Sequence, residues 1–155
     1  MILSGNTIRA RGIMIPHRPR SKSHGMSYGE SFAGYDIRIA NRVVLWPVIG
    51  RLAISLEKFV MPLDVLGRVS DKSTLARLGV AVQNTIIEPG WRGFLTLELS
   101  YTPTSWRRPL LVIKAGSPIA QVIFEQIDCE TEGYGSGKYQ NAAMIPQKAL
   151  FEAGE

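Results

Sequence analysis

Residues 88–100 read EPGWRGFLTLELS, and this stretch predicts a tight turn that leads into a strand. Pro89-Gly90 and Gly93 are typical of the connection in a β-hairpin. The segment that follows alternates between an aliphatic and a polar face, made respectively by Leu95, Leu97, Leu99 and by Thr96, Glu98, Ser100. Such a period-2 pattern indicates a strand with one face in a core and the other open to solvent or ligand.

Most of the predicted elements outside this stretch are also strands. Short runs rich in Val, Ile, Leu and aromatic residues occur at 35–39, 43–47, 51–56, 80–84, 94–100, 110–113 and 119–124. Residues 1–35 are predicted to be irregular, apart from a short helix near Ser4 to Ala10. Because the strands are short and evenly spaced, with no repeat or linker, we expect a single all-β domain over 1–155, a distorted β-barrel or jelly roll.

Residues 71–79 read DKSTLARLG and predict a helix of about two turns. Ser70 or Asp71 could cap it, and Gly79 could end it. Ser73 and Arg77 are four residues apart and therefore share a face. A hydroxyl and a guanidinium beside a helix N-terminus suit a phosphate, although a capped helix without a ligand is the more common explanation of such a segment taken alone.

The composition narrows the class of protein. The 155 residues carry a formal net charge of +5, with an early basic excess at Arg9, Arg11, Arg18, Arg20 and Lys22. This balance suits a polyanion such as a triphosphate or nucleic acid, or simply a solvated basic loop. No run is long enough to span a membrane, no signal peptide is recognisable, and the single Cys129 excludes an internal disulfide. We therefore expect a cytoplasmic protein.

Four stretches in the same order resemble the dCTP deaminase family, within the wider trimeric dUTPase superfamily. They are KSTLARLG at 72–79, EPGWRGFLTLE at 88–98, SYG with GYDIR at 27–38, and IAQVIF at 119–124. The resemblance implies a distorted β-barrel that assembles as a homotrimer with active sites between subunits. It also implies hydrolytic deamination of dCTP to dUTP and ammonia, which feeds dUMP and dTTP synthesis.

Zinc is not expected in such an enzyme. His17, His24 and Cys129 are the only soft ligands, and the H-x-E and P-C-x-x-C motifs of zinc nucleobase deaminases are absent. The same count excludes a structural zinc site. The one metal ion expected is Mg²⁺ that enters with the substrate triphosphate, since this ion needs few protein ligands.

Deamination requires a base that takes a proton from the water attacking C4 of cytosine. Glu98 falls where the family carries its catalytic Glu, although alternation alone would also fit a solvent-facing side chain. By the same resemblance, Ser73 holds the water or stabilises charge at C4, and Arg77 contacts substrate and lowers the pKa of Glu98. Lys72 would hold phosphate as a point charge, and Thr74 belongs to the same substrate-binding segment.

Further substrate contacts follow from the resemblance. Glu88 is expected near the deoxyribose, although an acid that initiates the turn is an alternative. Trp91 could pack against the sugar or simply fill the hairpin core. Thr96 and Leu97 would contact the base through their backbone groups.

The glycine-rich segment 132–140 reads EGYGSGKYQ and is expected to belong to a flexible C-terminal lid over about 130–155. Tyr134 and Lys138 resemble the residues that close over the triphosphate. An ordinary C-terminal turn is the alternative. Ala142 and Ala143 stand where the family usually shows Gln.

Two other functions stay open. One is a dUTPase, or a bifunctional enzyme that converts dCTP to dUMP and pyrophosphate. The acidic residue that dUTPases use after the helix is absent from 80–87, and the C-terminal arm has tyrosines in place of a Phe. The other is a non-catalytic relative that binds nucleotide, DNA or a regulator. The joint presence of Ser73, Arg77 and Glu98 favours catalysis, and neither a nucleic acid nor a membrane is expected as a partner.

Overall fold

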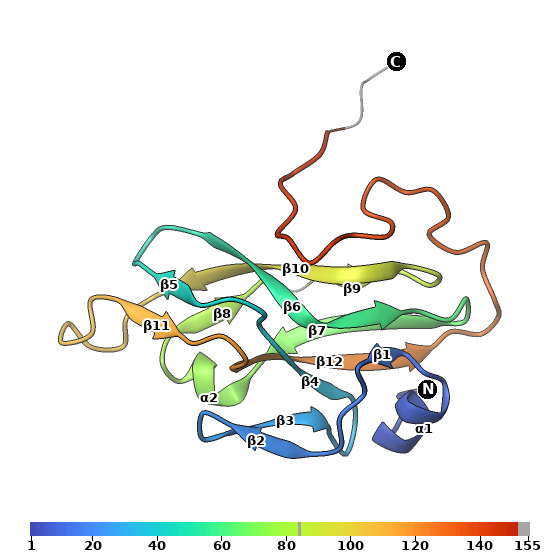
Figure 1. Ribbon diagram of the computed structural model, residues 1–155, viewed down its shortest axis with the longest axis horizontal. Coiled ribbons are helices and arrows are strands. Elements are labelled where there is room, and N and C mark those ends of the chain that lie inside the picture. The colour runs from blue at the N-terminus through green and yellow to red at the C-terminus, as the bar shows by residue number, and fades with distance from the viewer. Residues whose placement is uncertain (84, 152–155) are drawn as a thin grey trace.

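The computed structural model describes residues 1–83 and 85–151, and the regular elements in them are strands apart from two short helices (Figure 1). In chain order its elements are α1 (Gly5–Ala10), β1 (Met14–Ile15), β2 (Ser21–Ser23), β3 (Met26–Glu30), β4 (Tyr35–Arg38), β5 (Val43–Leu45), β6 (Arg51–Val60), β7 (Val65–Asp71), α2 (Ser73–Ala76), β8 (Val80–Val82), β9 (Ile86–Ile87), β10 (Arg92–Tyr101), β11 (Leu111–Ile113) and β12 (Pro118–Gln126). The all-β class is thus confirmed. No helix in the described part of the chain is long and apolar enough to cross a membrane.

The strands form three sheets whose paired strands are all antiparallel. Their orders are β1-β6-β10-β8, β2-β3-β4-β12-β7-β9 and β11-β5. Within the described residues these sheets do not close into a barrel. The expected barrel is therefore replaced by two larger sheets that share a core.

The core lies between the two larger sheets. The rings of Phe59 in β6 and Phe124 in β12 are 6.4 Å apart between centroids, and both side chains are fully buried. On β10 the alternation predicted from sequence is confirmed, because Leu97 is fully buried whereas Glu98 is exposed. Fully burying one such apolar side chain stabilises the fold by about 1.5–3 kcal/mol, so this face fixes the orientation of β10.

The N-terminal 35 residues are more ordered than expected. The helix near Ser4 is confirmed, with Ser4 as N-cap accepting a hydrogen bond from the Thr7 amide. The prediction of irregular structure elsewhere in this region is wrong, because β1, β2 and β3 lie there. The predicted strand at 80–84 is β8, and its expected last residue, Asn84, lies outside the described residues.

The helix predicted over 71–79 is shorter than expected. α2 spans Ser73–Ala76, and Lys72 occupies its N-cap position without a side-chain capping bond. The predicted caps were wrong because Ser70 and Asp71 end β7. The carboxylate of Asp71 instead accepts a hydrogen bond from the Val82 amide at 2.8 Å, which ties β7 to β8. Gly79 follows the helix at φ +89°.

The N-terminal region is fastened to the sheets by an ion pair between Arg11 and Asp64. The hydrogen bond from Arg11 lowers the pKa of Asp64 below 3.8. Because the folded-state pKa is lower than the unfolded one, this pair stabilises the fold above about pH 4 and loses its effect as the pH falls through the lowered value.

Replacing Arg11 with Met should therefore lower the melting temperature at pH 7, and the difference from the wild type should shrink as the pH falls to 3. Thermal unfolding of both proteins in steps between pH 7 and pH 3 would measure this. A difference that stays constant over that range would contradict the assigned ion pair.

Candidate active site

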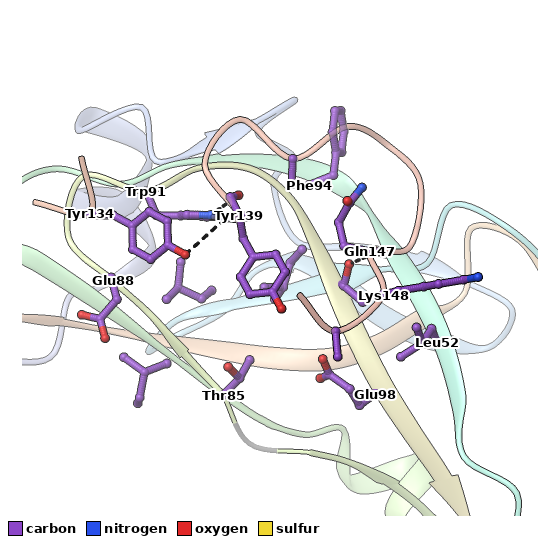
Figure 2. Close-up of a pocket in the computed structure, with 16 residues that line it drawn as sticks. Leu52, Thr85, Glu88, Trp91, Phe94, Glu98, Tyr134, Tyr139, Gln147 and Lys148 are labelled. Carbon is purple, nitrogen blue, oxygen red and sulfur yellow. Dashed lines mark hydrogen bonds between the residues drawn. The ribbon is translucent and has the colours of Figure 1, made fainter. Parts of the chain in front are cut away.

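A pocket lies between the polar face of β10, the segment around β9 and the C-terminal segment (Figure 2). Its polar and aromatic lining residues are Thr85, Glu88, Trp91, Phe94, Thr96, Glu98, Tyr134, Tyr139, Gln147 and Lys148. Its apolar walls include Leu52 and Ile87. A concave, mostly apolar site with a few convergent polar groups is the form that small-molecule sites usually take.

Two carboxylates line the pocket. Glu98 comes from β10, and Glu88 comes from the turn before it. The Glu98 backbone is fixed, because its carbonyl accepts a hydrogen bond from the Gln83 amide at 2.9 Å. Neither carboxylate forms a hydrogen bond or ion pair with any other residue that the structure describes, and Figure 2 shows the Glu98 side chain leaving β10 on the pocket side. An unpaired carboxylate held in a pocket can accept a proton from a water molecule.

The C-terminal segment forms one wall of the pocket. Trp91 Nε1 donates a hydrogen bond to the Tyr139 carbonyl at 2.8 Å, and the Tyr139 amide donates to the Tyr134 hydroxyl at 3.3 Å. Further along, the Gln147 amide donates to Thr96 Oγ1 at 2.9 Å. Trp91 lines the pocket, and the centroid of its ring lies 6.0 Å from that of Phe59 in the core. Its predicted core packing is therefore confirmed, whereas its contact with a sugar stays a prediction.

The same segment is joined to the start of β10 at Gly93. The Phe94 amide donates to the Ala142 carbonyl at 3.0 Å, and a parallel bridge links Gly93 with Ala142. A Cβ added to Gly93 would lie 2.7 Å from the Ala142 nitrogen, and Gly93 has φ +150°. Only glycine therefore allows the C-terminal segment to approach β10 this closely.

Replacing Gly93 with Ala should detach the C-terminal segment from β10. We expect limited proteolysis within residues 130–151 to become about fivefold faster, as the loss of one hydrogen bond would produce. Gly116→Ala is the matched control, because Gly116 also has a positive φ, +75°, but faces open space. Equal cleavage rates in the two variants would show that the contact with Ala142 does not hold the segment.

Several residues predicted from the sequence lie outside this pocket. Ser73, Thr74 and Arg77 are exposed on and beside α2, and none of them lines the pocket. The Arg77 guanidinium donates to the Ser73 backbone carbonyl at 3.0 Å, so it folds back along the helix to the position of Ser73. Within one chain, therefore, the structure does not bring Ser73 and Arg77 to Glu98.

Lys72 is engaged inside its own chain. Its Nζ lies 2.6 Å from Asp36 Oδ2 and 3.2 Å from Ser27 Oγ, and only 10% of its side chain is exposed. Arg38, two residues after Asp36, pairs with a different carboxylate, that of Glu57. In this arrangement the charge of Lys72 is compensated by Asp36 and not offered to a phosphate.

The remaining predicted contacts are divided between the pocket and its surroundings. Tyr134 lines the pocket, whereas Lys138 stands outside its lining with Nζ 5.5 Å from the Tyr139 ring centroid. Thr96 presents its side chain to the pocket, whereas the Leu97 side chain is fully buried. The sequence did not point to Leu52, Thr85, Phe94, Tyr139, Gln147 or Lys148, which reach the pocket only through the fold.

Several known proteins resemble this chain in sequence. Residues 7–127 match a family model described as dCTP deaminase-like. The chain is 34% identical to a dCTP deaminase of Methylococcus capsulatus over an alignment of 175 residues, gaps included. This alignment covers 88% of this chain and 90% of the relative. A dCTP deaminase of Campylobacter hominis is 33% identical over 175 residues, covering 91% and 90%.

Solved structures share the fold at lower sequence identity. The 2'-deoxycytidine 5'-triphosphate deaminase from Agrobacterium tumefaciens superposes with a TM-score of 0.61 at 18% identity, over 81% of this chain and 47% of that one. The native EIAV dUTPase superposes with a TM-score of 0.55 at 19% identity, over 73% of this chain and 86% of that one. At these identities the likeness concerns the fold.

Proposed function

The chain belongs to the dCTP deaminase-like family, and from that premise we propose that it hydrolyses dCTP to dUTP and ammonia. The observation that carries the proposal is the Glu98 carboxylate, which lies unpaired in a pocket with a largely apolar lining. Outside residue 84 and residues 152–155, no group of three or more His, Cys, Asp or Glu side chains is arranged to hold a metal ion. We assign water activation to the Glu98 carboxylate because it lies unpaired in this pocket.

The chemistry follows from the position of one base. Glu98 takes a proton from water, and the water oxygen attacks C4 of the cytosine. Glu98 passes this first proton to N3, where it stays in the uracil product. The second water proton, on the new C4 hydroxyl, then passes through Glu98 to the exocyclic nitrogen, which leaves as ammonia while C4 becomes a carbonyl. One carboxylate can perform both transfers because it is returned unprotonated at the end of the cycle.

The other pocket residues would hold the nucleotide around this base. Glu88 is placed to accept a hydrogen bond from the deoxyribose, and Trp91 offers its ring to the sugar. Thr96, together with the Leu97 backbone, would orient the base. Tyr134 and Tyr139 would cover the ligand from the C-terminal wall.

We further propose that the site is completed by a neighbouring copy of the chain in a homotrimer. Ser73 and Thr74 on α2 and Arg77 directly after it are exposed and do not line the pocket of their own chain, so they can reach a neighbour's pocket. An Arg from another subunit would supply the positive charge that a triphosphate needs beside two carboxylates. Mg²⁺ would enter with the triphosphate, with Lys138 closing from the C-terminal segment. Such an enzyme would act in the cytoplasm.

Incubating the purified protein with dCTP and Mg²⁺, followed by chromatography of the products, tests the function. Accumulation of dUTP together with an equal amount of ammonia is the expected result. Formation of dUMP and pyrophosphate would indicate a bifunctional enzyme, and dUTP should be offered separately to test that step. Unchanged dCTP would mean that the chain binds nucleotide without turning it over, and the proposal would be wrong.

A further inference from the structure

Opposite the pocket-lining part of β10, strand β6 carries a bulge. Lys58 pairs with Phe94, and the next pair along the ladder is Ile54 with Thr96. Three residues of β6, Ser55 to Glu57, therefore face Leu95 alone. Such a bulge interrupts the ladder and leaves backbone groups that need other partners, and bulges are frequent beside active sites.

The Ser55 hydroxyl supplies those partners. It accepts a hydrogen bond from the Leu95 amide at 2.8 Å and donates one to the Glu57 carbonyl at 2.7 Å. Ser55 is fully buried, so water cannot replace either bond. One side chain thus closes the bulge and holds β10 at the residue just before Thr96.

The Glu57 carboxylate ties the other side of the bulge to β4. It is fully buried and accepts hydrogen bonds from the Arg38 backbone amide at 2.9 Å and from Arg38 Nε at 2.7 Å. The Arg38 guanidinium also lies 4.2 Å from the centroid of the Tyr28 ring. Ser55 itself forms a bridge with Ile39, which directly follows β4. The bulge is therefore fixed on both edges of β6.

We propose that Ser55 is a positioning residue for the reaction, acting through the register of β10; this inference depends on the proposed role of Glu98. Beyond the bulge, Thr96 faces Ile54 and Glu98 faces Leu52. Because side chains alternate along a strand, a change of register at Leu95 would turn Glu98 away from the pocket. The hydrogen bonds of the Ser55 hydroxyl therefore determine which residues of β10 pair with β6 beyond Leu95.

Replacing Ser55 with Ala removes both hydrogen bonds and keeps the small volume. We expect kcat for dCTP to fall roughly ten- to a hundredfold, as for a catalytic group displaced by about 1 Å, with a smaller change in KM. Ser55→Thr keeps the hydroxyl and should recover most of kcat. Ile8→Ala is the control for stability, because Ile8 is fully buried in α1, which contributes no residue to the bulge or to the pocket lining; its melting temperature should fall while its kcat below that temperature is unchanged.

Amide hydrogen exchange measures the positioning without any turnover. In Ser55→Ala, exchange should become faster in residues 94–98 relative to the wild type, and Ile8→Ala should not show this local change. Wild-type kcat together with wild-type exchange in Ser55→Ala would overturn the inference, as would a Ser55→Thr variant as slow as Ser55→Ala. If the wild type itself forms no dUTP, the proposed function fails, and the exchange data still decide whether Ser55 fixes β10.

Discussion

Glu98→Gln is expected to lower kcat for dCTP deamination by roughly a hundred- to ten-thousandfold, the usual effect of removing a general base. The amide keeps the shape of the side chain and cannot take a proton from water. Because the Glu98 carboxylate forms no hydrogen bond or ion pair with another described residue, the substitution should leave the fold and its melting temperature unchanged. Single-turnover formation of dUTP and calorimetric binding of dCTP would separate chemistry from binding.

Glu88→Gln is the matched control, since it changes the other carboxylate of the same pocket. It should raise KM for dCTP more than it lowers kcat, because Glu88 is assigned to the sugar and not to the proton. Normal turnover by Glu98→Gln would show that another group activates water. If only Glu88→Gln lost kcat, the general base would have to be assigned to Glu88, in the turn before β10.

β10 could be predicted from the sequence because its apolar and polar residues alternate in the same way as its buried and open faces. Leu95, Leu97 and Leu99 alone identify the face that packs in the core. β2 is different, because its residues Ser21–Ser23 are polar and become a strand only through pairing with β3. β7 was missed because Gly67 and Arg68 interrupt its apolar pattern. A Cβ on Gly67 would stand 3.2 Å from the Ile87 side chain, so the absence of a side chain there suits the close packing of β7 against β9.

The residues of the candidate site could be predicted where they belong to a sequence motif. Those that only the folded chain brings to the pocket could not be predicted. Glu88, Trp91 and Glu98 lie within one short stretch, and all three line the pocket. Gln147 and Leu52 reach the same pocket from positions far apart in the sequence, without any local pattern. The ion pair of Lys72 with Asp36 was likewise not predictable, because it joins residues 36 positions apart.

Mixed oligomers of two inactive variants test whether the site is shared between subunits. Arg77→Ala and Glu98→Gln should each be nearly inactive as pure proteins, because the proposed site needs both residues. If Glu98 of one subunit works with Arg77 of its neighbour, unfolding and refolding an equal mixture should restore activity to about a quarter of the wild-type value. That fraction is the chance that one subunit retains Glu98 and its neighbour retains Arg77 in a closed ring with random assembly.

The restored activity discriminates between the two arrangements because each variant chain lacks one of the two residues. If both residues served the same chain, no chain in the mixture would be intact, and refolding together would restore nothing. A mixture of the two proteins without unfolding is the control for exchange between oligomers. A double variant carrying Arg77→Ala and Glu98→Gln in one chain, refolded with the wild type, should again give about a quarter of fully active sites for a shared site, but about half for a site within one chain.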